Sequence, residues 1–402
     1  MHFFSFYADY LPCFIGAALF FVLALVLWQL SRRALANSRG GTEWVREYRA
    51  SGFDFTKQRL TAPRHDWLCL FGVIVFTLLF SAGVLLLRGY SESGSWLARF
   101  LRPKTACKLV IFAAGAFSVC WLLMDLFKNN TLAVCGSILF GVSFVGHHAP
   151  MALVCCSLLL LLRWFVSDDD APLFPGVLLL LAADILLAVA ASRSIGLAYL
   201  AVVYFVLHIC KSIRRQSAGA PIWQLFVMPL CGLIVWAVAF YAGRIAMMYI
   251  GGMISLTNVS KLLSVQYFGR EMLRLVSLPT MIFRGQLSKG MLLFPLTDAP
   301  LLAAGFFGFF VAVRTASERH DPAALASAAV LAVLALVWLF RRDYCVLPGL
   351  LLCTVCLFRR FTAAETSWPA VTYTVLACIY YAAIIVLTYL MKLPSALAGV
   401  LL

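Results

Sequence analysis

Charge is scarce in this sequence of 402 residues, and acidic charge is scarcest. Charged residues make up 12% of the chain, about half the roughly 25% of a soluble domain, and the 17 acidic residues face 32 Lys and Arg. Hydrophobic residues make up 63%, against roughly 45–50% in soluble domains. This balance excludes a globular enzyme with a single anchor. It predicts an all-α polytopic membrane protein, because helices satisfy their own backbone groups inside lipid.

Other features that the sequence lacks exclude further classes of protein. The net charge of +15 is accompanied by no nucleic-acid recognition motif, so anionic lipids or lipid phosphates are the expected partners, not nucleic acid. The 13 cysteines lie mostly inside apolar runs, which argues against a disulfide framework. Cys353 and Cys356 form a C-x-x-C inside the apolar run 350–358, which favours a packing pair over a redox motif. The first apolar run lacks a basic n-region and is too long for a signal peptide, so we expect it in the mature protein.

The apolar runs predict a bundle of about twelve transmembrane helices. They cover residues 11–30, 67–87, 109–127, 132–145, 151–165, 176–191, 195–209, 222–241, 301–313, 323–340, 346–358 and 368–390. We divide the chain into an N-terminal helix (1–30), a cytoplasmic basic loop (31–66) and a membrane domain (67–402). The arginines that follow the first run place the N-terminus outside. The longest extracytoplasmic loop is then 243–292.

A tight hairpin with an arginine at its tip is the most informative stretch. The runs 176–191 and 195–209 are joined only by Ser192, Arg193 and Ser194. An isolated guanidinium in hydrocarbon costs several kcal/mol at least, so Arg193 must meet water, a carboxylate or a phosphate. The second arm ends in a cation cluster typical of the cytoplasmic side, Lys211, Arg214 and Arg215. We therefore expect Arg193 on the opposite, extracytoplasmic side.

Further cations gather on that outer side, in 244–289 and at 341–342. The basic stretch 88–108 either also lies outside and binds something anionic, or the topology differs there. Arg270 and Arg274 are four residues apart beside apolar neighbours, which predicts an amphipathic helix at the outer leaflet. Lipid headgroup binding by that helix is one interpretation. The other is a site for a lipid-linked phosphate or diphosphate, which guanidinium groups bind in bidentate fashion.

Three ordered segments resemble the bacterial O-antigen ligase and O-antigen polymerase superfamily. They are the Ser-Arg hairpin, a Gly-Arg segment with a following proline, and a later Gly-x-x-Gly helix. The matching residues are Ser192, Arg193, Ser194, Gly196, Gly269, Arg270, Pro279, Gly305 and Gly308. The resemblance covers about 175–313.

The resemblance implies a GT-C-like bundle in a bacterial inner membrane with an undecaprenyl-diphosphate-linked glycan as donor. It implies no metal and no cofactor. The acceptor would be the lipid A core or a lipid-linked repeat unit. The family's two arginines grip the diphosphate, which assigns that role to Arg193 and Arg270, with Arg274 and Arg284 in support.

One departure concerns the catalytic base. Family ligases carry a histidine before the Gly-x-x-Gly helix, whereas this chain reads LLFPLTDAPLL there. Asp298 is the only ionisable residue of that stretch and is the candidate base. Its alternative role is a helix cap before Pro300. The missing histidine favours the polymerase branch.

Two alternative functions remain open. Asp184 lies inside an apolar run and requires a partner, but it is nine residues, about 13 Å along a helix, from Arg193. A buried acid of this kind suits a transporter or flippase for a lipid-linked or anionic solute. A catalytically inactive relative of the family is the third possibility. His147 and His148 lack a third ligand nearby, so no metal site is predicted.

Overall fold

The computed structural model describes most of the apolar runs and few of the connections. The described residues are 11–37, 66–93, 103–127, 129–143, 149–166, 173–193, 197–198, 200–217, 219, 221–250, 266, 269–270, 298–319, 322–341, 346–362 and 367–390. Apart from short turns, the regular structure in these residues is helical. The twelve helices are α2 (Leu11–Asn37), α4 (Asp66–Ser93), α6 (Pro103–Phe127), α7 (Asn130–Val142), α8 (Ala149–Val166), α9 (Leu173–Arg193), α10 (Leu200–Ser217), α11 (Trp223–Ile250), α15 (Ala299–Arg319), α16 (Pro322–Arg341), α17 (Leu347–Thr362) and α18 (Trp368–Leu390).

The all-helical fold is confirmed, and each of the twelve apolar runs corresponds to one helix. Several helices extend beyond the predicted runs. The largest differences are at the ends of α2, α10 and α11, followed by the end of α4, the start of α6 and the end of α15, where segments expected outside the apolar runs are helical. Hydropathy marks where a helix would leave lipid, whereas intrahelical hydrogen bonds continue through polar helix-forming residues.

Five described helices are long and apolar enough to cross a bilayer, which identifies an integral membrane protein. They cover Phe14–Arg32, Trp67–Leu87, Trp223–Ala246, Ala299–Glu318 and Trp368–Leu387. Shorter apolar helices among the described residues include Gly176–Ser192 and Leu200–Ile213. The structure therefore supports membrane spans without establishing the predicted number of twelve.

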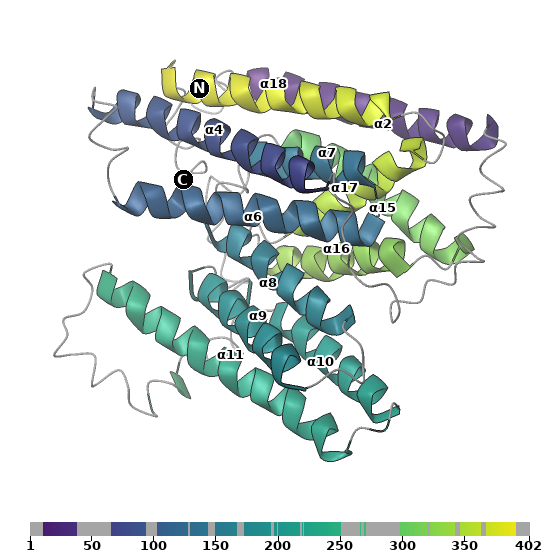
Figure 1. Ribbon diagram of the computed structural model, residues 1–402. Helices are drawn as coiled ribbons and strands as arrows, with labels where there is room; N and C mark the ends of the chain where they lie inside the picture. The colour runs from purple at the N-terminus through teal and green to yellow at the C-terminus, as the bar shows by residue number, and fades with distance from the viewer. Residues whose placement is uncertain are drawn as a thin grey trace.

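The helices form two groups that meet through α6 and α8 (Figure 1). In one group α15 packs against α17 and α2, while α7 contacts α4, α17 and α18. In the other group α9 packs against α8 and α11, and α10 packs mainly on α11. The two arms of the predicted hairpin, α9 and α10, contact each other far less than each contacts α11. Helix α11 therefore joins the two arms, because both pack mainly against it or α8 rather than against each other.

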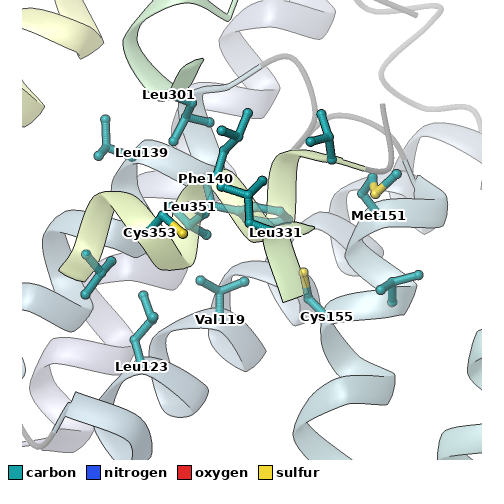
Figure 2. Close-up of a cluster of buried hydrophobic side chains, with 14 of the residues drawn as sticks. Val119, Leu123, Leu139, Phe140, Met151, Cys155, Leu301, Leu331, Leu351 and Cys353 are labelled. Carbon is teal, nitrogen blue, oxygen red and sulfur yellow. The ribbon is translucent and has the colours of Figure 1, made fainter. Parts of the chain in front are cut away.

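The main apolar core lies where helices α6, α7, α8, α15, α16 and α17 meet. Figure 2 shows side chains from these helices converging, among them Val119, Phe140, Met151, Leu331 and Cys353. Cys353 and Cys356 are both buried and neither forms a disulfide, consistent with a packing pair. The thiols in the described residues form no disulfide.

The Gly-x-x-Gly of the family resemblance brings two helix backbones into contact. A methyl group at Gly305 would lie 2.8 Å from the carbonyl oxygen of Leu350 and 2.9 Å from its Cα. A methyl group at Gly308 would overlap the carbonyl group of Cys353. Small residues one turn apart allow such close packing, which is a common way to join helices in membranes. The motif therefore joins α15 to α17.

Helix α10 is polar on its buried side and apolar on its exposed side. The buried positions include Tyr204, His208, Lys211 and Ser212, which follow the i, i+4, i+7, i+8 spacing of one helix face. Large apolar residues such as Val202 and Val206 are exposed. This inversion is typical of a membrane helix with a polar interior. Lys211, expected at the cytoplasmic surface, is buried instead because it lies on the face that packs inward.

Candidate functional site

The structure describes the predicted site residues unequally. Arg193 is the last residue of α9, but its side chain lies outside the described residues, as do Arg274 and Arg284. Arg270 is exposed. Asp298 is fully buried. The predicted gathering of these residues around one diphosphate therefore remains a prediction.

The tip of the hairpin lies against a second arginine, Arg244 of α11. Its Nη1 donates a hydrogen bond to the carbonyl oxygen of Ser192 at 3.2 Å. The Ser192 hydroxyl donates to the carbonyl of Val189 at 2.7 Å, so both polar groups of Ser192 are engaged. Gly243 permits this approach, because a methyl group there would lie 2.9 Å from Ser192 Oγ.

This contact places a cation on the C-terminal end of α9. The last carbonyls of a helix lack partners within it and carry partial negative charge, so a guanidinium there stabilises the helix end. Arg193 is the next residue along the chain. The structure therefore brings two arginines from two helices to one end of the bundle. The sequence alone placed Arg244 in a loop, whereas it belongs to α11.

Asp298, the candidate base, lies at the start of α15. Its Oδ1 accepts a hydrogen bond from the Tyr381 hydroxyl at 3.0 Å, and its carbonyl accepts from the Leu302 amide at 2.9 Å. The Tyr373 hydroxyl donates to the carbonyl of Pro300 at 2.6 Å. Two tyrosines of α18 thus fix the first turn of α15, and the buried carboxyl belongs to this junction.

A second ionisable group in the bundle is the buried pair Asp184 and His208. Each side chain is only 2% exposed, and His208 Nε2 lies 3.7 Å from Asp184 Oδ1. The Trp164 ring packs on the imidazole in a T-shaped arrangement with centroids 5.3 Å apart. Asp184 therefore has the partner that its position required, and that partner comes from α10.

Two hydroxyl groups close to Asp184 and His208 form hydrogen bonds that reach α8. Ser157 Oγ donates to the carbonyl of Ala183 at 2.5 Å and lies 2.7 Å from the Tyr204 hydroxyl. A serine hydroxyl has one hydrogen, so Tyr204 is the donor in the second bond. These bonds join α8, α9 and α10 one residue from Asp184 and four residues from His208.

A small cavity opens beside the pair. Asp184, Tyr204, His208 and Trp236 line it, and its free space of about 10 Å³ suits one water molecule. Gly232 of α11 forms another wall, where a methyl group would lie 2.7 Å from the His208 ring and 3.0 Å from Asp184 Oδ2. The cavity thus depends on the absence of a side chain at Gly232.

Sequence reasoning missed His208. A usable signal was present, because Tyr204, His208, Lys211 and Ser212 repeat at the spacing of one helix face inside an apolar run. Polar residues spaced in this way inside a membrane helix mark an inward face. His147, His148 and the acidic turn 168–170 lie outside the described residues. Among the residues that the structure describes, no three metal-ligating side chains converge.

Comparisons with protein families, with curated proteins and with solved structures found no match to this chain. The fold and the site therefore define a class, a helical integral membrane protein with buried ionisable groups. The resemblance to O-antigen ligases and polymerases stays a prediction.

Proposed function

We propose that this chain is a membrane glycan transferase of the O-antigen polymerase or ligase type. It moves a glycan from undecaprenyl diphosphate to a sugar hydroxyl on the periplasmic face of a bacterial inner membrane. The observation that supports this most is the contact between Arg244 and the carbonyl of Ser192, beside Arg193. Two arginines at neighbouring ends of α9 and α11 suit a diphosphate headgroup, with the lipid tail lying among the helices.

The chemistry follows from the charge that develops on the leaving group. As the glycosidic bond to the diphosphate breaks, negative charge grows on the phosphate oxygens, and fixed cations stabilise it. Arg193 and Arg244 supply cations from the helix ends. In this proposal Arg270, Arg274 and Arg284 contribute from the outer loop. The acceptor is a lipid-linked repeat unit in a polymerase and the lipid A core in a ligase.

Asp298 has two possible roles in this proposal, a base for the acceptor hydroxyl or a cap for α15. Asp298→Asn keeps an oxygen that can accept from the Tyr381 hydroxyl, but it removes the basic carboxylate. General base catalysis contributes typically 10²–10⁴-fold. A loss of that size in transfer rate, with unchanged thermal stability, assigns Asp298 as the base. An unchanged rate assigns it to the helix junction.

The main test compares arginine variants for donor binding. Arg193→Ala is expected to weaken the binding of undecaprenyl diphosphate to the purified protein by roughly 10- to 100-fold, because a charge-assisted hydrogen bond contributes about 1.5–3 kcal/mol. Binding is measured from the ligand-induced rise in unfolding temperature. Arg244→Lys keeps the positive charge but removes the planar guanidinium, so it shows which of the two donor binding needs. Arg314→Ala is the control, because Arg314 is 55% exposed and pairs with Glu318 at 2.7 Å on the surface.

A deletion strain identifies the branch. A lipopolysaccharide core carrying a single repeat unit indicates a polymerase, and a bare core with accumulating lipid-linked polymer indicates a ligase. An Arg193→Ala strain that still makes full-length surface polysaccharide would contradict the proposal.

A transporter for a lipid-linked or anionic solute is the second candidate, and the buried pair Asp184 and His208 favours it. Ionisable residues inside membrane helices mark proton relays in transporters. This alternative predicts solute movement across proteoliposomes that responds to a proton gradient and stops in Asp184→Asn. Glycan transfer without such movement would exclude it.

A further inference from the structure

We infer that Asp184, His208 and Trp236 form an internal site that binds one water molecule and one shared proton at mid-depth of the bundle. The site does not use the arginines of the proposed function. It lies about 12 Å along α9 from Ser192, since eight residues at 1.5 Å each separate Ser192 from Asp184. Failure of this inference therefore leaves the transferase proposal standing, and the reverse also holds.

The depth of the site follows from the positions of its residues. Asp184 lies near the centre of α9 (Leu173–Arg193), and His208 lies near the centre of α10 (Leu200–Ser217). Trp236 lies near the centre of α11 (Trp223–Ile250). All three helices thus place a polar side chain at the same level, far from both ends.

Several polar atoms at this level lack a protein partner. Within the described part of the chain, no hydrogen bond reaches Asp184 Oδ2, either ring nitrogen of His208 or the indole nitrogen of Trp236. The 3.7 Å between His208 Nε2 and Asp184 Oδ1 is too long for a direct hydrogen bond. Buried polar groups are nearly always satisfied by protein or by ordered water.

One water molecule accounts for three of these four atoms. The cavity beside the pair offers about 10 Å³, close to the minimum that a water needs. A buried water makes two to four hydrogen bonds. Here it would receive the indole N–H of Trp236 and donate to Asp184 Oδ2, with a His208 nitrogen as its third partner. Gly232 keeps the space open.

The proton content follows from charge balance. With one proton, the pair is either a neutral carboxyl beside a neutral imidazole or a carboxylate beside an imidazolium, and the net charge is zero in both forms. A second proton, or none, would leave an unpaired charge in apolar surroundings. Exchange between the two forms breaks the O–H bond at Asp184 as an N–H bond forms at His208, either directly or through the water.

Other titratable groups near the pair come from α8 and α10. Tyr204 of α10 lines the same cavity as Asp184 and His208, and Cys155 of α8 is buried two residues from Ser157, the partner of Tyr204. Lys211 is the nearest cation along α10 and lies three residues from His208. From α11 the pair faces the indole of Trp236 and the backbone of Gly232. These groups leave Asp184 and His208 as the two that share the proton.

The buried polar stripe on α10 extends past His208 toward one end of the bundle. It continues from His208 to Lys211 and Ser212, toward the C-terminal end of α10 and away from Arg193. Gln224, buried near the start of α11, lies at that same end and carries an amide oxygen without a partner among the described residues. We infer that water reaches the pair from this end of the bundle.

The test uses the full chain in lipid nanodiscs with ¹⁵N-labelled histidine and tryptophan. His208 can be assigned by selective labelling of the Leu207–His208 peptide, a pair of residue types that occurs once in the sequence. Wild-type protein is expected to show magnetisation transfer from water to His208 and to the Trp236 indole. Asp184→Asn is expected to shift both His208 nitrogen resonances, because Asn cannot exchange the proton. Ser137→Ala, which removes a hydroxyl bonded within α7 at 2.6 Å, is the control.

Two further variants address the cavity and its access. Gly232→Ala fills the space and is expected to abolish the water signal at His208. Ser212→Val is expected to slow water exchange at His208 several-fold, whereas Ile213→Val, on the exposed side, is expected to leave it unchanged. Absence of a water signal at both His208 and Trp236 in the wild type overturns the site. If the His208 nitrogen resonances do not shift in Asp184→Asn, the pair does not share a proton. If water exchange at His208 is equally fast in Ser212→Val and Ile213→Val, water does not enter from this end.

Discussion

At the scale of single residues, the hydroxyl of Ser157 joins three helices. It donates to the carbonyl of Ala183 on α9 and accepts from Tyr204 on α10, while Ser157 itself belongs to α8. Both side chains are buried, so the Tyr204 hydroxyl depends on Ser157 for a partner. The two hydroxyl groups are not equivalent, because Ser157 retains its bond to Ala183 when Tyr204 loses its hydroxyl.

We predict that Ser157→Ala destabilises the protein more than Tyr204→Phe. Ser157→Ala leaves the Tyr204 hydroxyl buried without its acceptor, which costs about 1–3 kcal/mol. Tyr204→Phe removes one bond and leaves Ser157 donating to Ala183, which costs about 0.5–1.5 kcal/mol. Reversible denaturation in mixed micelles measures both values, and the double variant gives the coupling between them. Equal effects of the two single changes would contradict the bonding pattern.

At the scale of helices, apolar runs placed the elements correctly because a helix closes its backbone hydrogen bonds within itself. The twelve predicted runs and the twelve helices coincide, while the polar ends of α4, α6 and α15 were missed. Pairing of the helices follows other rules. Helices α9 and α10 are consecutive, yet each packs mainly on α11 or α8.

The junction between α15 and α17 supplies a test at this scale. Gly308→Ala is expected to destabilise the protein by about 1–3 kcal/mol or more, because the methyl group meets the backbone of Cys353 and no rotamer change relieves the overlap. Gly83→Ala on α4 is the matched control, since a methyl group there meets nothing within 4 Å. It should be neutral or stabilising by up to about 1 kcal/mol. Thermal unfolding in detergent compares the two, and a neutral Gly308→Ala would refute the close packing.

At the scale of the whole molecule, the distribution of polarity is that of a protein in lipid. Apolar side chains such as Leu68, Phe226 and Ile379 are exposed, whereas Asp184, His208 and Lys211 are buried. A protein in water would expose the charged groups and bury the large apolar ones. The surface of the bundle therefore suits a hydrocarbon solvent.

This distribution predicts the behaviour of the full chain during extraction. The protein is expected to remain in the membrane fraction after washes with high salt and alkaline carbonate, and to leave it only with detergent. Salt removes proteins held by surface charge, whereas five apolar helices of spanning length are held by their burial in hydrocarbon. Immunoblotting of the fractions measures this, and release by carbonate alone would contradict the assignment as an integral membrane protein.

Composition and hydropathy by themselves determined the class of protein, its helical fold and the location of its helices along the chain. Each of these properties depends on one segment and the solvent around it, so the local sequence is enough to specify it. Only the tertiary structure decided that His208 is the partner of Asp184, that Arg244 meets the end of α9 and that Gly308 touches α17. Such contacts depend on which helices pack together and how each is rotated, and residues 24 to 52 positions apart meet only when those choices are made.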